Sequence, residues 1–411
     1  MKRTFSLRQQ LLLASGLGLI AATYGLVRLA YGLFLPDVQR DLGLGSGAAG
    51  WVSSGASVLY CVGAVAGFVL AARVPRALVA VAAVVAGGGA IGMAAAGDPV
   101  VFGAASIVGS AGAGLASPAL VRLVTEHLPP DGRDRAQAVV NAGTGPGLVA
   151  AGVLALLLLP DWRTAWACSG VFALIVGGVL LAVTHRGGHR TSTRAATRTT
   201  APGAPWWRAH RSVLALALLF GAGSAVVWTY GRSVLVDAGA PVVVSVSAWI
   251  ALGLGGAAVV VTARWTSPLR ARTQWAVTTT AVALGVLALG TLPQWTVLAL
   301  VSCAVFGWGY TAATGALIAW TTEVEPDRAS AGTSVLFVAL VLGQAAGAAA
   351  AGALLGPAGS PAVFVSGALV TAACAALGLR VRAGDAARSS GCTPPTPRSR
   401  RAVRSRRPAA P

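Results

Sequence analysis

Long apolar stretches separated by short polar connections run along most of the chain. A bilayer core needs about 20 apolar residues in a helix, because backbone polar groups in hydrocarbon must be hydrogen-bonded within their own segment. This requirement predicts an all-α membrane protein with twelve transmembrane helices, at about 11–35, 47–71, 76–96, 100–122, 136–159, 163–184, 212–236, 242–263, 273–291, 295–320, 329–354 and 361–380.

The twelve predicted spans divide into two sets of six with similar local sequences. Thr-Tyr-Gly recurs at 23–25 in span one and at 229–231 in span seven, and three further matches occur in the same order in the two halves. Internal repeats of this kind are typical of membrane transporters. We therefore expect two pseudo-symmetric six-helix bundles over 1–184 and 212–381, a basic cytoplasmic linker over 185–211, and a disordered basic tail over 382–411.

The charge of the chain is distributed very unevenly. The sequence has 31 Lys and Arg against 12 Asp and Glu, a net charge of +19, although only 10% of its residues are charged and 55% are hydrophobic. Of the 31 basic residues, 27 fall on one side of the predicted spans, Arg40 and Arg163 fall on the other, and Arg28 and Arg232 lie within spans. The positive-inside rule then predicts a multi-pass protein of the cytoplasmic membrane with both termini cytoplasmic.

The distribution of basic residues also indicates which molecules the protein contacts. A nucleic-acid-binding protein carries its basic residues on a polar surface, so we expect membrane lipids rather than nucleic acid to meet this charge. The five cysteines form no CxxC pair and the four histidines lie in polar connections, so no metal, cofactor or disulfide framework is expected. No ATP-binding loop is present, and an ion or solute gradient would have to supply energy.

The span number, the duplication, the basic linker and the cytoplasmic ends together resemble the major facilitator superfamily of secondary transporters, over residues 1–381. That superfamily has a Gly-x-x-x-Asp-Arg-x-Gly-Arg-Arg loop between spans two and three, which pins the cytoplasmic gate. This chain keeps Gly67 and Arg76 but has Ala71, Ala72 and Val74 where the Asp, Arg and Gly would lie. The resemblance implies a gating role for Gly67 and Arg76.

Two further stretches resemble exporters of this superfamily. Span five contains Gly-Thr-Gly-Pro-Gly at 143–147, similar to a Gly-Pro element of exporters, which implies a gating role for Gly145 and Pro146. Residues 25–31 resemble the Gly-x-Gly-Arg-Phe-x-Tyr run of predicted bacterial efflux permeases, with Val27 and Leu29 departing from it. Both resemblances favour efflux.

Two arginines inside the predicted spans are the leading candidates for substrate binding. Charge within a span costs several kcal/mol unless it is paired or wet, and a guanidinium can bind a carboxylate or phosphate bidentately. Tyr24 and Tyr31 share a helical face with Arg28, and Trp228 precedes Arg232 by one turn. We expect these five residues to bind an anionic group, the alternatives being that Arg28 ties span one to neighbouring carbonyls and that Arg232 reaches the outer headgroups.

The remaining candidates are weaker. Asn141 and Gln344 are the only amides in the middle of spans five and eleven, and they could line a substrate cavity or hydrogen-bond between helices. Asp37 and Asp237 lie near the outer ends of spans one and seven, where they are coupling candidates or solvated loop residues.

These features predict a secondary active transporter that acts as a monomer and works by alternating access. We expect it to export a small organic and anionic solute. An importer or anion exchanger of the same fold is the first alternative. A membrane sensor or membrane-embedded enzyme is a remote one, because the acidic residues are dispersed along the chain.

Overall fold

The computed structural model describes residues 6–185, 203–266 and 268–381, and every regular element in these ranges is helical. The elements are α1 (Leu7–Ile20), η1 (Ala21–Leu29), α2 (Tyr31–Leu42), α3 (Ser46–Leu70), α4 (Pro75–Ala95), α5 (Pro99–His127), α6 (Pro130–Asn141), α7 (Thr144–Leu158), α8 (Trp162–His185), α9 (Ala204–Asp237), α10 (Val242–Thr266), α11 (Ala271–Thr291), α12 (Thr296–Val324), η2 (Pro326–Arg328) and α13 (Ala329–Arg380).

Twelve crossings of the membrane account for these helices. Eleven segments are long and apolar enough to span a bilayer, and the last of them, Gly332–Arg380, has 49 residues. That length is about twice what one crossing needs, and Gly359 interrupts the helix with φ 76° and ψ 161°. Spans eleven and twelve are therefore the two parts of α13, and the predicted all-helical fold is confirmed.

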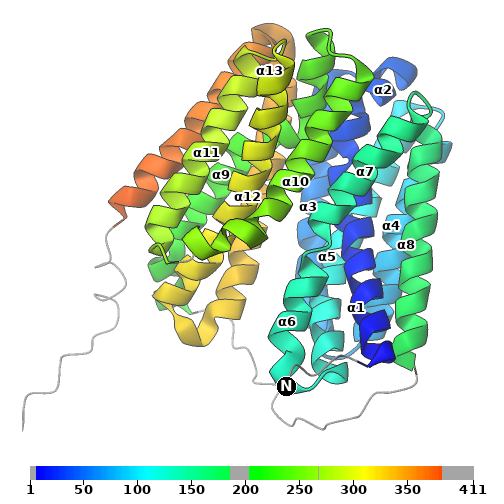
Figure 1. The fold of residues 1–411 in the computed structure, drawn as a ribbon, viewed down its shortest axis with the longest axis vertical. Helices are drawn as coiled ribbons and strands as arrows, with labels where there is room; N and C mark the ends of the chain where they lie inside the picture. Colours follow the sequence, from blue (N-terminus) through cyan, green and yellow to red (C-terminus); the bar gives the residue numbers. More distant parts are fainter. Residues whose placement is uncertain (1–5, 186–202, 267, 382–411) are drawn as a thin grey trace, which may run out of the picture.

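The helices form two groups that follow the order of the chain. α1 to α8 pack mainly on one another, as do α9 to α13, while α3 with α13, α7 with α10 and α2 with α9 make the main contacts between the two halves. Figure 1 shows the halves meeting along their upper parts and separating toward the lower end. We call the lower end, where Figure 1 shows α6 and the start of α1, the basic side, because Arg133 lies in α6 and Arg8 in the first turn of α1, and we call the other end the opposite side.

Small residues let the helices approach closely, and large apolar residues cover the outside. A Cβ added at Gly63 of α3 would lie 2.6 Å from the carbonyl oxygen of Ala111 in α5, so these two helices are in backbone contact. Leu157, Val260 and Val297 expose about three quarters of their surface. Such exposure is favourable only where lipid tails cover the side chains.

The largest departures from the predicted bounds are at the end of the first span and at the start of the seventh. The first helix continues to Leu42 rather than to 35, because the polar residues 37–41 are hydrogen-bonded within the protein, and it ends at Gly43 with φ 69°. α9 begins at Ala204, inside the predicted linker, where Trp206 packs on His210 with ring centroids 4.0 Å apart. The rest of the linker and the tail lie outside the described residues.

Candidate functional site

Arg28 lies in η1, a π-helical segment in the middle of the first span. π-Helical turns are rare and occur frequently at functional sites. Gly25 brings this segment against the backbone of α7, since an added Cβ would lie 2.5 Å from the Cα of Gly147. Backbone contact with α7 thus fixes the turn that presents Tyr24 and Arg28.

The guanidinium of Arg28 contacts neutral groups from both halves. Its Nη2 donates to Oε1 of Gln344 at 3.2 Å, and its Cζ lies 4.5 Å from the ring centroid of Tyr60. Gln344 in turn donates through Nε2 to the hydroxyl of Tyr310 at 2.9 Å. Arg28 has no ion pair among the described residues, so its charge is met by an amide and an aromatic ring.

A small cavity between the two halves brings most of the predicted binding residues together. Arg28, Tyr31, Trp228 and Gln344 line it, and its volume is about 30 Å³. A site for a small organic ligand usually measures about 300–1,000 Å³, whereas one water needs only about 10–15 Å³ of such space. The space between these side chains is therefore large enough for water but too small for an organic ligand in this conformation.

Two hydrogen-bond donors beside this cavity lack acceptors. Nε of Arg28 and Nε1 of Trp228 are buried and have no partner in the described part of the chain. A buried donor without an acceptor costs about 1–3 kcal/mol.

The predicted tyrosines lie on either side of Arg28 along the first span. Tyr24 shares a hydrogen bond of 3.1 Å with the hydroxyl of Tyr60, and the rings meet edge to face. Tyr31 donates to the carbonyl of Ala49 at 3.0 Å and thereby ties α2 to α3. Tyr24 thus reaches the surroundings of Arg28 through Tyr60, while Tyr31 lines the cavity directly.

Aromatic rings form the wall on the C-terminal half. Trp228 lies edge to face against Tyr310, Phe306 and Trp249, with centroid separations of 5.1, 5.5 and 6.2 Å. Rings packed in this way have little freedom. Trp228 lines the Arg28 cavity, so this ring cluster gives the cavity an aromatic surface on the C-terminal half.

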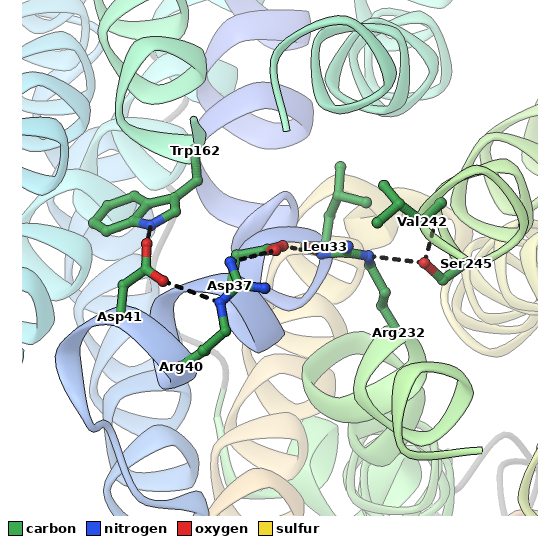
Figure 2. A network of polar contacts seen from close by, with 8 residues as sticks. All are labelled: Leu33, Asp37, Arg40, Asp41, Trp162, Arg232, Val242 and Ser245. Atoms are coloured by element: carbon green, nitrogen blue, oxygen red, sulfur yellow. Dashed lines mark hydrogen bonds and ion pairs between the residues drawn. The ribbon is translucent and has the colours of Figure 1, made fainter. Parts of the chain in front are cut away.

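Arg232 lies apart from this cavity, in the polar network of Figure 2. Its side chain is 1% exposed and forms an ion pair with Asp37, which is 5% exposed. It also donates through Nη1 to the carbonyl of Leu33 at 2.7 Å and through Nε to Oγ of Ser245 at 3.2 Å. Because Arg232 is buried, it does not reach the outer lipid headgroups, which was the alternative considered from the sequence.

The network continues from Asp37 toward the surface of the opposite side. Arg40 donates to Asp37 at 3.3 Å and to Asp41 at 3.1 Å, and Trp162 donates to Asp41 at 2.8 Å. Asp37 and Arg232 belong to different halves, so this ion pair joins α2 to α9. Asp37 is a buried helical residue and not a solvated loop residue.

Comparison with known proteins identifies the family of this chain. The Major Facilitator Superfamily model matches residues 17–331, more than three quarters of the chain. The chain belongs to the major facilitator superfamily. A search of curated proteins finds no significant match.

Solved structures of superfamily transporters share the fold of this chain at low sequence identity. The nucleoside transporter NupG has a TM-score of 0.76 at 14% identity, with 91% of this chain and 99% of that chain covered. A peptide transporter POT mutant gives 0.75 at 14%, covering 93% and 95%, and the D-xylose-proton symporter gives 0.70 at 15%, covering 90% and 96%. This superfamily member is therefore a multi-pass membrane transporter and not an enzyme.

The residues to which the resemblance gave gating roles lie at helix contacts of the transporter. A Cβ at Gly67 would lie 3.1 Å from Cγ of Pro118, within the N-terminal half, and Arg76 donates to the carbonyl of Leu181 at the end of α8. A Cβ at Gly145 would lie 3.6 Å from the carbonyl oxygen of Gly253, across the two halves. Pro146 lies in the first turn of α7, just after the break between α6 and α7.

Asn141 and Asp237 lie away from the Arg28 cavity. Asn141 is the exposed last residue of α6, toward the basic side. Asp237 is the exposed last residue of α9, on the opposite side, where it lines a second cavity. Gln344 is thus the one predicted amide that reaches Arg28.

Sequence reasoning did not place Tyr310 or Tyr60 among the binding residues of this transporter. Both surround Arg28 and its partner Gln344. A usable signal was present, because all five tyrosines of the chain lie within apolar spans. A phenol in hydrocarbon needs a partner for its hydroxyl, which indicates a buried polar site.

Contacts between the halves gather toward the opposite side. The hydroxyl of Tyr230 donates to the carbonyl of Ser46 at 2.7 Å, and the hydroxyls of Ser53 and Thr229 lie 2.9 Å apart. A Cβ at Gly50 would lie 2.5 Å from the carbonyl oxygen of Ala348. With the pair of Asp37 and Arg232, these contacts hold the two halves together on that side.

Proposed function

We propose that this transporter exports a small organic anion across the cytoplasmic membrane by alternating access, with Arg28 as the group that binds the anion. The observation that carries the proposal is a guanidinium at the boundary of the halves that has no acidic partner among the described residues. A charge at membrane depth is retained where it has a function or a partner. An anionic ligand would supply the missing countercharge.

The neighbours of Arg28 fit such a ligand. The unpartnered donors Nε of Arg28 and Nε1 of Trp228 suit carboxylate or phosphate oxygens, and the aromatic wall suits an apolar body. Arg28 and Gln344 come from different halves. A substrate between them would therefore exchange contacts when the halves move.

The proposed orientation and direction come from the sequence. The distribution of basic residues favours a cytoplasmic basic side, and the Gly-Pro element at the break of span five favours export. In that orientation the contacts of the opposite side close the external face in this conformation.

The ion pair of Asp37 and Arg232 is our proposal for the coupling site. It is buried, joins the halves, and connects through Arg40 to the opposite side. Loss of the negative charge of Asp37 would leave Arg232 without a countercharge and weaken the closed external face. Replacing Asp37 with Asn removes that charge while keeping the size of the side chain.

A ligand screen tests the proposed binding group. We expect small carboxylates or phosphates to raise the Tm of the purified protein, because a ligand that binds the folded state stabilises it. The Arg28→Gln variant should lose the shift, whereas Arg264→Gln should keep it, since Arg264 lies over Trp265 at 3.9 Å and away from the cavity. A shift that persists in Arg28→Gln contradicts the assignment.

The alternative of an importer or anion exchanger makes a different prediction. An exchanger needs substrate on both sides of the membrane and no proton gradient. Counterflow in proteoliposomes preloaded with a ligand from the screen separates the two functions, because an exporter coupled to protons responds to an imposed pH difference.

A further inference from the structure

A second cavity, of about 220 Å³, lies between the halves on the opposite side, apart from the Arg28 cavity. Gln39 of α2 and Ser46 of α3 line it from one half. Residues of α9 and α13 line it from the other half, among them Tyr230, Ser233, Asp237 and Phe364. The proposed transport of anions gives this cavity no role.

Three of the lining residues form one stripe along α9. Tyr230, Ser233 and Asp237 are spaced by three and four residues, so they lie on the same face of the helix. Oγ of Ser233 is buried and has no partner in the described ranges. The stripe thus presents a carboxylate and an unsatisfied hydroxyl to the same space.

The charge in this cavity is negative and uncompensated. Asp237 is the one charged residue that lines the cavity, and it has no ion pair within 6–185, 203–266 and 268–381. It is also the last residue of α9, where the helix dipole is negative and a carboxylate is unfavourable. A cation in the cavity would neutralise the carboxylate and would also interact favourably with the negative end of the helix dipole.

The rings in the lining indicate which kind of cation fits. Tyr230 and Phe364 line the cavity beside the carboxylate, and aromatic faces attract ammonium groups. Ser46, Ser233 and Ser360 line the same space, so their hydroxyl oxygens are available to accept hydrogen bonds from an ammonium. A protonated amine would pair with Asp237 and donate to Ser233.

We propose that this cavity is a binding site for a small organic ammonium, with Asp237 as its countercharge and Ser233 as its hydrogen-bond acceptor. Because both halves contribute to the walls, the bound ammonium stabilises the conformation in which the opposite side is closed. The site is independent of Arg28 and of the anionic substrate.

Thermal unfolding of the full chain in detergent, with ethylammonium chloride as the probe, tests the proposal. At about tenfold excess over Kd, we expect Tm to rise by about 2 °C relative to sodium chloride at equal concentration. Asp237→Asn should abolish the rise, and Arg28→Gln should retain it. If the Arg28→Gln variant keeps the rise in Tm, ethylammonium binds at a site other than the proposed anion site. This result does not depend on whether Arg28 binds an anion.

The matched control is Asp161→Asn. Asp161 is an exposed aspartate of the same side, hydrogen-bonded to Thr164 at the start of α8, and Asn caps a helix about as well as Asp. This variant should keep the response to ethylammonium. Equal responses to sodium and ethylammonium, no response at all, or an unchanged response in Asp237→Asn would each overturn the proposal.

A second variant covers the case in which Asp237→Asn does not fold. Ser233→Ala removes the acceptor and leaves the carboxylate in place, so we expect the ethylammonium concentration for half of the maximal shift to rise severalfold. An unchanged midpoint concentration in this variant contradicts the assignment of Ser233 and, with it, the site.

Discussion

At the residue scale, two arginines in the same kind of sequence context have different surroundings. Arg232 has a buried carboxylate partner, Asp37, and a carbonyl and a hydroxyl that accept from it. Arg28 has an amide and a phenol ring. Since a buried charge needs compensation, the first arginine is satisfied within the protein and the second is suited to a ligand.

The pairing of Asp37 with Arg232 predicts strong coupling between the two residues. Breaking a buried ion pair by removing one partner costs about 3–5 kcal/mol, because the other charge stays buried. We expect Asp37→Asn and Arg232→Gln each to lower the free energy of unfolding by about this amount, and the double variant to lower it by less than their sum. Equilibrium unfolding of the four proteins measures the coupling, and strictly additive losses would show that the charges do not interact.

The sequence was sufficient to select four residues that line one cavity, but not the residues that contact them. Arg28, Tyr31, Trp228 and Gln344 were predicted as binding residues, and all four line one cavity. Arg232 was predicted as a binding residue and Asp37 as a coupling candidate, because nothing in the sequence indicates that two residues 195 positions apart form an ion pair. Such pairings depend on how the halves pack, which local patterns do not encode.

At the element scale, the first span is divided into α1, η1 and α2, and its central turn depends on backbone contact with α7. Gly25 and Gly147 provide that contact. Hydrophobicity predicts only one continuous helix here, because apolar residues fill a π-helical turn as readily as an α-helical one.

Substitution of Gly25 tests the role of this contact. In Gly25→Ala the new Cβ would meet the backbone of α7, so we expect a loss of stability of about 1–3 kcal/mol from overpacking and weaker binding of any ligand that Arg28 holds. Gly88→Ala is the control, because an added Cβ there has open space. Equal Tm values for Gly25→Ala and the control would contradict the role of the contact.

The first turn of α8 predicts a pH dependence outside the membrane. Hydrogen bonds from the Thr164 hydroxyl and backbone lower the pKa of Asp161 below its ordinary value. A lowered pKa in the folded state stabilises the fold above the unfolded pKa of about 3.9, and this contribution is lost as the pH falls through the folded pKa.

Thr164→Val should therefore raise the pKa of Asp161 toward its ordinary value and reduce the loss of stability on acidification between about pH 5 and pH 2. Titration of Asp161 by NMR in wild type and variant measures the change. An unchanged pKa in the variant would show that Thr164 does not stabilise the carboxylate.

At the scale of the whole molecule, the halves are joined toward the opposite side and diverge toward the basic side (Figure 1). The number of spans and the helical class followed from hydrophobic length, because the bilayer limits what an apolar segment can form. The sequence did not predict which ends of the halves are joined, because the same pattern of spans is compatible with halves joined at either end.

A reversible crosslink between the halves tests whether they must separate during transport. The hydroxyls of Ser53 in α3 and Thr229 in α9 lie 2.9 Å apart, so cysteines at both positions can approach disulfide geometry. We expect oxidation of Ser53→Cys/Thr229→Cys to stop transport and reduction to restore it. Each single variant serves as the control, and continued transport by the crosslinked protein would contradict alternating access.

Transport by purified protein in proteoliposomes is the most direct test of the central claim, that Arg28 binds an anionic group of the transported solute. The probe is the organic anion that raises Tm most in the ligand screen, and the proteins are wild type, Arg28→Gln, Arg28→Lys and Arg264→Gln, reconstituted at equal amounts. The account predicts transport by wild type and Arg264→Gln, a reduced rate for Arg28→Lys, and none for Arg28→Gln. Wild-type rates in Arg28→Gln would contradict it.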